Sequence, residues 1–285
     1  MDEEPEPVMQ RRYVERRGAL AALCLSLAFA WPGHAGDRGA DGHFEKRTSS
    51  HFILFQDVDI DRSSGFRGSR RFEQQVLAIL EQAYVQLDHF LGLRPERPIT
   101  VVIYDPGIFD ATYSGLFRFP AAGFYGDAIH IRGETLVTER LTRVLHHELA
   151  HAALDAASPS LVVPAWFNEG IAEWFEARSG GKRSLDAYQA DLLSRASSLG
   201  ALFSLGDLAA PSLAHLSSDA AQLAYTQAYG FFAYLARAKG EDKLQELLAD
   251  YLRSRELERA FRRTFRADLA RLEARYAAQL GTRSR

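Results

Sequence analysis

Two histidines and a glutamate near the middle of the chain have the spacing of a metal-binding motif. The segment His147-Glu148-Leu149-Ala150-His151 places two imidazoles four residues apart. On a helix, residues four apart lie on one face, one turn along, so both rings can reach a single ion. Glu148 lies about 100° around the helix from His147, where its carboxylate can approach the open side of that ion. This chemistry suits Zn²⁺, which binds imidazole nitrogen and needs a third protein ligand and a water molecule for catalysis.

The residues around this motif favour an amphipathic helix over 138–156. His146 points about 100° away from His147 on such a helix, so we expect it not to bind the same ion. A polar helix face with two histidines that bind no metal is the alternative interpretation. The apolar residues of the helix form a stripe beside the ligand face: Leu141, Val144, Leu145, Leu149 and Ala152.

A second helix, expected over 165–178, carries three carboxylates on one face. Glu169, Glu173 and Glu176 lie at positions i, i+4 and i+7, among large apolar residues. Carboxylates in such surroundings need a positive partner, which a zinc ion and its histidines would supply. Pro164 suits the start of this helix because the first helical N–H has no partner within the helix. For Glu173 and Glu176, a solvated acidic face is the alternative.

The two segments together resemble a known family of enzymes. HHELAH at 146–151 and PAWFNEGIAEW at 164–174 are similar to the gluzincin metallopeptidases, and most to the family called peptidase MA-like. The resemblance covers roughly residues 52–235 and includes a strand, helix, strand order before the metal-binding helix. The interval between the second histidine and the glutamate is shorter here than in well-known gluzincins.

Carried over to this sequence, the resemblance implies a role for each residue of the two motifs. The metal ligands would be His147, His151 and Glu169, which hold one zinc ion per chain, and Glu148 would be the general base. Glu173 matches the carboxylate that often orients the first histidine, since a bound imidazole usually donates its other N–H to such a group.

The resemblance also implies a tyrosine that acts on the transition state. The segment YTQAYGFFAYL at 225–235 is similar to the helix that carries a catalytic tyrosine in related aminopeptidases. This assigns to Tyr225 a hydroxyl that donates to the oxyanion formed when water attacks an amide. Tyr229 is the alternative donor, and both could instead be core aromatics of an amphipathic helix.

The distribution of apolar residues elsewhere predicts an α+β fold. Strands are expected at 51–58, 98–104 and 127–132, with a helix at 71–91 and an aromatic, irregular segment at 109–124. The strand at 127–132 is at the place where similar enzymes pair an edge strand with an extended substrate. We expect His130 on it to be an ordinary surface histidine, and a position facing the cleft is the alternative. Further helices are expected at 184–197, 219–238, 243–254 and 257–280.

A few strands followed by many helices predict a small N-terminal mixed sheet with helices, the zinc-binding helix, and then a mostly α-helical C-terminal lobe. We expect three parts of the chain. These are a signal peptide at 1–35, an N-terminal α/β part at 36–158 that includes the HExxH helix, and a helical lobe at 159–285 that carries the glutamate ligand.

The N-terminal segment has the order of a secretory signal peptide. Four arginines precede an uncharged apolar run at 18–31, which is shorter than the roughly 20 residues that span a bilayer. Cys24, the only cysteine, lies inside it, so the mature chain would have no disulfide and no thiol. We therefore expect an exported protein, periplasmic or extracellular, without a stable membrane span after cleavage. An uncleaved membrane anchor is the alternative, and Met9 could be the true start.

The composition is that of a globular protein with no basic footprint. Apolar residues make up 47% and charged residues 25% of the chain, and the net charge is −3, which argues against a nucleic-acid partner. The function expected is zinc-dependent hydrolysis of amide bonds in a peptide or protein substrate. A non-catalytic zinc-binding or protein-interaction module, a helical scaffold without metal, and hydrolysis of a non-peptide substrate are the alternatives. The sequence does not indicate cleavage specificity, endo- or exopeptidase action, or oligomeric state.

Overall fold

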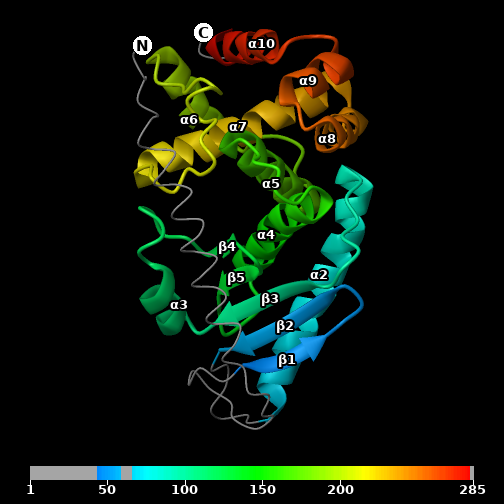
Figure 1. The fold of residues 1–285 in the computed structure, drawn as a ribbon. Helices are drawn as coiled ribbons and strands as arrows, with labels where there is room; N and C mark the ends of the chain where they lie inside the picture. The colour runs from blue at the N-terminus through cyan, green and yellow to red at the C-terminus, as the bar shows by residue number, and fades with distance from the viewer. Residues whose placement is uncertain (1–43, 59–65, 283–285) are drawn as a thin grey trace, which may run out of the picture. The chain divides into compact units, whose positions relative to one another are not determined.

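The computed structural model describes residues 44–58 and 66–282, and the predicted signal peptide lies outside them. Five strands form one sheet in the order β1-β2-β3-β5-β4 (Figure 1). The central pairs β2-β3 and β3-β5 are parallel, and the outer strands β1 and β4 are antiparallel to their neighbours. The strands are β1 (Glu45–Thr48), β2 (Phe52–Asp57), β3 (Ile99–Tyr104), β4 (Gly123–Tyr125) and β5 (Ile129–Arg132).

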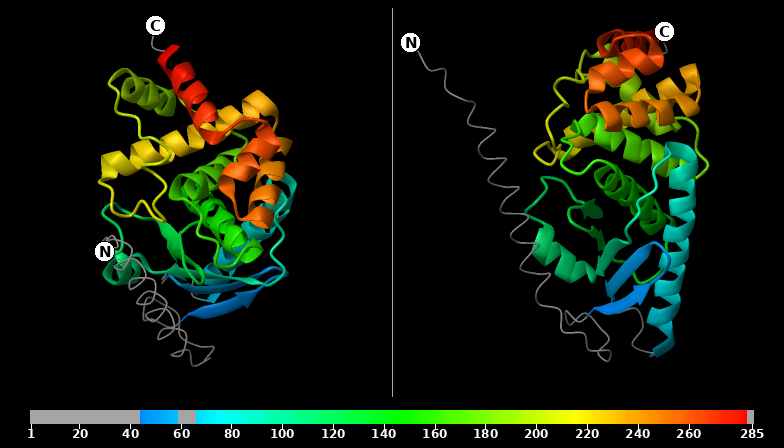
Figure 2. Two further views of the ribbon diagram at one scale, coloured as in Figure 1. Left: turned by 45° about the horizontal axis from the view of Figure 1, so that its top comes forward. Right: turned by 45° about the vertical axis from the view of Figure 1, so that its right-hand side comes forward.

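Helices make up most of the remaining described chain. Figure 2 shows α2 running from the sheet to the C-terminal helices, and α4 packs against both α2 and the strands β4 and β5. The helices are α2 (Phe66–Leu91), α3 (Pro106–Tyr113), α4 (Glu139–Ala157), α5 (Ala165–Ser179), α6 (Ala187–Ser198), α7 (Ser218–Lys239), α8 (Asp242–Ser254), α9 (Leu257–Phe265) and α10 (Leu269–Thr282). A small mixed sheet followed by a mostly helical body confirms the predicted α+β class. The division of the chain at residue 158 stays a prediction.

Several elements differ from the expectations. The segment 45–48, for which no strand was predicted, forms β1, and the segment expected to be irregular overlaps α3 and β4. The single helix expected at 257–280 is two helices, because Arg266 adopts a left-handed backbone conformation with φ 52° that no helix can continue through. The edge strand beside α4 is β4, not the strand at 127–132, which lies between β3 and β4.

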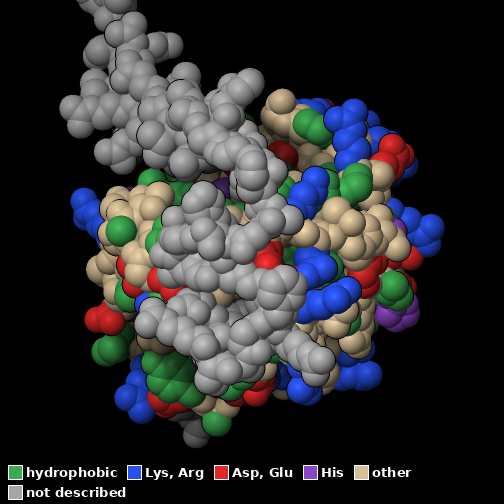
Figure 3. Space-filling model, turned by 90° about the horizontal axis from the view of Figure 1, so that it is seen from below, with side chains coloured by type: hydrophobic (Ala, Val, Ile, Leu, Met, Phe, Trp, Pro, Cys, Tyr) green, Lys and Arg blue, Asp and Glu red, His purple; other side chains and the backbone are tan. Residues whose placement is uncertain are grey.

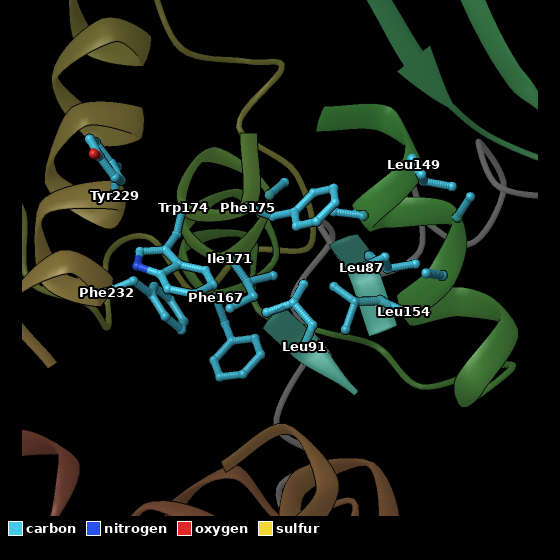
Figure 4. Close-up of a cluster of buried hydrophobic side chains, with 14 of the residues drawn as sticks. Leu87, Leu91, Leu149, Leu154, Phe167, Ile171, Trp174, Phe175, Tyr229 and Phe232 are labelled. Atoms are coloured by element: carbon cyan, nitrogen blue, oxygen red, sulfur yellow. The ribbon is translucent and has the colours of Figure 1, made fainter. Parts of the chain in front are cut away.

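The centre of the helical body is α5, which is buried on most of its circumference. Figure 4 shows its side chains inserted between α2, α4 and α7. Such burial on all sides explains why the segment is apolar around the whole helix except where its three glutamates lie. The residues that meet there are Phe167, Ile171, Trp174 and Phe175 of α5, Leu87 and Leu91 of α2, Leu149 and Leu154 of α4, and Phe232 of α7.

In the view from below, acidic and basic side chains are interspersed over the uncovered part of the face (Figure 3). Within the described residues, none of the helices combines the length and the apolar composition that crossing a membrane requires.

Candidate metal centre

The two histidines of the HExxH motif are carried by α4. A side-chain cap fixes where this helix starts. The Thr138 hydroxyl accepts a hydrogen bond from the Leu141 N–H at 3.1 Å, which satisfies one of the unpaired amide groups of the first turn. From there the helix runs with Leu145, Leu149 and Ala152 buried in the core. The opposite face carries His147 and His151, whose side chains are 14% and 9% exposed.

The glutamate is carried by α5, whose first turn is held by backbone from another part of the chain. Pro164 gives no side-chain cap, and the N–H groups of Ala165 and Trp166 donate instead to the carbonyl oxygens of Ala210 and Leu208 at 3.0 and 3.1 Å. Backbone amides buried in this way need such partners. The segment that follows α6 therefore positions the start of α5.

Gly170 allows α5 to pack closely against α7. A Cβ atom at this position would lie 2.6 Å from a ring carbon of Phe232 and 3.0 Å from the Ala228 carbonyl oxygen. A side chain of any size would force the two helices apart. The glycine directly after Glu169 thus brings α7, and the tyrosines it carries, up to the glutamate.

Donor atoms from the two helices converge on one point. The Glu169 Oε2 atom lies 3.3 Å from His147 Nε2 and 3.4 Å from His151 Nε2, and the three atoms can hold one metal ion. Donor atoms about 2.0–2.1 Å from a zinc ion at tetrahedral angles lie about 3.3–3.4 Å apart. The three residues predicted as ligands are therefore brought together at the separation that such a site requires.

The far side of each imidazole faces an acceptor. The Asn168 Oδ1 atom lies 3.0 Å from His151 Nδ1, a position from which it accepts the ring N–H and leaves Nε2 free to bind a metal. No role was predicted for Asn168, although it directly precedes Glu169 in the motif. Only the distance between the two helices reveals that its amide meets the second histidine.

Two glutamates rather than one face the first histidine. The Nδ1 atom of His147 lies 3.7 Å from Glu173 Oε1 and 3.6 Å from Glu176 Oε2. Glu176 is also paired with Arg143, whose Nε atom lies 2.6 Å from Glu176 Oε1. The structure thus brings Glu173 to its predicted neighbourhood and adds Glu176, which sequence reasoning could not separate from a solvated acidic face.

Burial and neighbouring charges shift the pKa values of Glu173 and Glu176 in opposite directions. Burial raises the pKa of Glu173 to about 7. Burial also opposes the charged form of Glu176, but its contacts with His147 and Arg143 outweigh that effect and lower its pKa. For Glu169, burial is likewise outweighed by the charges of His151 and His147, so its pKa lies below the usual value for glutamate.

Glu148 is buried beside the donor atoms. Its side chain is 5% exposed, and its Oε2 atom is buried with no hydrogen-bond partner among the described residues. Burial raises its pKa, with the nearby His147 and His151 acting in the opposite direction. A buried carboxylate oxygen without a partner is costly to a fold and is found where a ligand or substrate is to be bound.

Tyr225 projects from α7 toward the same point. Its ring centroid lies 6.4 Å from that of His147. Burial raises the pKa of its hydroxyl well above 10, and the charge of Glu169 and a hydrogen bond to that residue add to the effect. The hydroxyl therefore stays protonated and can donate. Tyr229, one turn along α7, is buried at 3% exposure and packs in the core (Figure 4).

The two remaining histidines of interest lie away from the donor atoms. His146 has its Nδ1 atom 2.6 Å from the Thr142 carbonyl oxygen and its ring against Phe175, in keeping with the expectation that it does not share the metal. The expectation of a surface position for His130 is wrong. Its side chain is buried, stacked on Phe124 and in contact with the Tyr104 hydroxyl at 2.8 Å.

The edge strand β4 lies along the ligand face of α4. A Cβ atom at Gly123 would lie 2.9 Å from Val144, so the strand approaches the helix closely there. At its other end, the Tyr125 hydroxyl donates to Asp155 at 2.9 Å. The strand beside the ligand-bearing helix thus has an outer edge with no partner strand in the described sheet.

The comparisons with known proteins agree with this geometry. No curated protein gives a significant match to the sequence. The family model of the peptidase MA superfamily matches residues 79–282, a span that contains both motif helices, the edge strand and the helix of Tyr225. Because this match covers well over half of the sequence, the chain belongs to the peptidase MA superfamily, as the two motifs predicted.

Proposed function

We propose that the protein is an exported zinc metallopeptidase in which His147, His151 and Glu169 hold one zinc ion. The observation that carries this proposal is the convergence of two imidazole nitrogens on one carboxylate oxygen at 3.3 and 3.4 Å. Membership of a peptidase superfamily supports the reaction class. When bound, a zinc ion supplies Lewis acidity, which makes a water molecule a nucleophile near neutral pH and polarises the scissile carbonyl.

Glu148 is the general base of the proposed reaction. It accepts a proton from the attacking water and delivers it to the nitrogen of the leaving amine. The partnerless Oε2 atom supports this role, because it can take up a proton without breaking a hydrogen bond within the described protein. Its burial also excludes bulk water from the path of that proton.

Tyr225 donates a hydrogen bond to the carbonyl oxygen as negative charge develops on it. The role is supported by the position of its ring beside His147 and by the direction of its pKa shift, which keeps the proton on the hydroxyl. A donor that is fixed before the reaction stabilises the transition state without reorganisation.

The substrate of this proposal is a peptide in extended form. The outer edge of β4 offers backbone N–H and C=O groups along the ligand face of α4, and a peptide paired with it lies across the donor atoms. Export rests on the signal-peptide pattern at residues 11–35. It is tested by sequencing the N-terminus of the protein recovered from outside the cytoplasm, where an intact leader would contradict cleavage.

The test of the enzymatic proposal compares the protein with Glu148→Gln and, as a matched control on the exposed first turn of α4, Glu139→Gln. Zinc content is measured alongside hydrolysis of casein and of a peptide library. We expect about one zinc per chain in all three proteins, and a loss of hydrolysis of about 10²- to 10⁴-fold for Glu148→Gln alone. Full activity of Glu148→Gln would refute the mechanism. Zinc binding without turnover of any peptide would instead favour a non-catalytic zinc-binding module.

A further inference from the structure

A pocket with a volume of about 490 Å³ lies between the end of α3, the segment 114–122, and the start of α4. We call it the arginine–aromatic pocket. Its walls combine ring faces with guanidinium groups, and Asp110 is the only acidic residue among those that line it. The residues used below to define it are Tyr113, Phe117, Arg118, Phe119, Arg132 and Arg140.

The pocket is next to the candidate metal centre. Arg140 precedes His147 by seven residues on α4, which places it on the same helix face about 10 Å away along the axis. Phe119 contacts Tyr225 at a ring-centroid distance of 6.2 Å, and the Tyr225 ring lies beside that of His147. The rings of Phe119 and Tyr225 therefore connect the wall of the pocket to the candidate metal centre.

The pocket also adjoins the N-terminal end of the edge strand β4. Phe117 lies 5.9 Å from Phe124 of β4, measured between ring centroids. At about 3.3 Å per residue, a peptide paired with β4 covers the distance from the donor atoms to the pocket with about three residues. Antiparallel pairing is the more stable arrangement and directs the C-terminal half of the peptide toward the start of β4.

The positive charges of the pocket differ in how far they are already neutralised. Arg132 forms two hydrogen bonds with Asp110, both at 2.8 Å, and Arg140 is paired more loosely with Glu134 at 3.3 Å. Arg118 is exposed, and no carboxylate among the described residues forms an ion pair with it. Its backbone is held in place, because its N–H donates to the Ala214 carbonyl oxygen at 3.1 Å.

We propose that the arginine–aromatic pocket binds a carboxylate carried by the substrate about three residues to the C-terminal side of the scissile bond, with Arg118 as its main partner. This inference rests on the proposed peptidase function. The unpaired guanidinium supplies the charge, and the rings of Phe117 and Phe119 shield the contact from water and accept the apolar part of the residue. The carboxylate can be an acidic side chain or the free C-terminus of a short peptide.

The experiment uses internally quenched fluorescent peptides that differ at one position. The third residue after the cleaved bond is Glu, Gln or Lys, and a parallel pair ends at that residue with a free acid or an amide. A further peptide carries Glu three residues before the bond instead. They are assayed at low ionic strength with the protein, with Arg118→Glu, and with the control Arg183→Glu, an exposed arginine that lies outside the arginine–aromatic pocket.

We expect the protein and the control to cleave the Glu peptide or the free-acid peptide with a kcat/KM roughly three- to fivefold above that of its uncharged counterpart. In Arg118→Glu this preference should disappear, and the Lys peptide should become the better substrate. Preference for the Glu peptides would identify a side chain as the source of the carboxylate, and preference for the free acid would identify the chain end. Both outcomes support the proposal.

A binding measurement distinguishes a failure of this inference from a failure of the proposed function. Peptide affinity is measured by fluorescence anisotropy on Glu148→Gln, with and without the Arg118→Glu substitution, so that turnover is not needed. Charge-dependent binding, together with no hydrolysis by the unmodified protein, would support the pocket proposal and contradict the peptidase proposal. Cleavage with no dependence on charge, or a preference only for Glu before the bond, would overturn the pocket proposal and leave the peptidase proposal intact.

Discussion

The metal centre and the arginine–aromatic pocket both include residues of α4 but are built from different kinds of structure. The donor atoms come from α4 and α5, whose inner faces are buried among side chains of α2 and α7. The pocket is built largely from a segment without regular structure, and its guanidinium groups are partly or fully exposed. Rigid helices fix groups that must meet within a few tenths of an ångström, whereas an irregular segment is sufficient to hold charges that act over longer distances.

The largest effect is expected from the removal of a ligand. His151→Ala should abolish stoichiometric zinc binding and lower hydrolysis at least about a thousandfold, because two donors do not hold the ion. Zinc content after gel filtration, measured together with peptide hydrolysis, checks this. His146→Gln is the control, since the adjacent histidine contacts the Thr142 carbonyl instead of the donor atoms. Loss of zinc in both variants would show that the helix, and not the ligand set, was damaged.

Tyr225→Phe should lower kcat by about a hundredfold while zinc content stays at its original level, because one preorganised donor to the oxyanion is lost. Steady-state kinetics on a single cleavable peptide provide the measurement. Tyr229→Phe is matched to it one turn along α7 and should leave kcat within about threefold, since Tyr229 is a buried member of the hydrophobic core. The reverse result would make Tyr229 the donor.

Asn168→Ala should weaken zinc binding by about 10- to 100-fold, because the His151 ring loses the acceptor that fixes its orientation. Competition with a chromogenic chelator measures the affinity. Asn168→Asp retains an acceptor at the same place and should restore most of it. Equal affinity for all three proteins would show that packing alone orients the imidazole.

Gly170→Ala should lower the free energy of unfolding by about 1–2 kcal/mol, because the added methyl group would overlap Phe232 and outweigh the higher helix propensity of alanine. Urea denaturation followed by circular dichroism measures it. Gly180→Ala is the control, as its Cβ atom would meet nothing closer than 3.6 Å. An unchanged midpoint for Gly170→Ala would mean that α7 can shift without cost.

The smallest effect on stability is expected in the pocket. Phe117→Ala removes a ring that is only partly buried and should lower the free energy of unfolding by less than about 1 kcal/mol, while raising KM about two- to threefold for an acidic peptide. The same denaturation and kinetic assays apply. A loss of stability as large as that of Gly170→Ala would show that the irregular segment of the pocket is as sensitive to substitution as the packed helices of the metal centre.

The parts of the molecule that sequence analysis predicted are those with strong local signals. The helix α4 begins at Glu139, one residue after the expected start, where the Thr138 cap precedes an apolar stripe of helical period. The spacing of His147 and His151 and the carboxylate face of α5 likewise need no tertiary information. Membership of the superfamily followed from the same two segments.

The remaining features depend on contacts between distant segments. The strand β1 has the polar sequence EKRT, and only its pairing with β2 makes it a strand. The boundary between α9 and α10 falls at Arg266, where neither glycine nor proline marks it. The start of α3 has two local signals, the Asp105 cap and Pro106. The segment was nevertheless predicted to be irregular, because Pro120 and Gly123 farther along it break regular structure. Asn168 and Glu176 acquire partners only once two helices are packed together.

The hydrogen bonds of the amides at the start of α5 restrict which changes of sequence this protein tolerates. Ala165 and Trp166 are anchored by main-chain oxygens of residues 208 and 210, and every amino acid presents such an oxygen. Point mutations in that stretch are therefore tolerated as long as its path is kept, whereas an insertion or deletion there would displace the glutamate ligand. Among homologues, constant length should mark this loop more clearly than constant residues do.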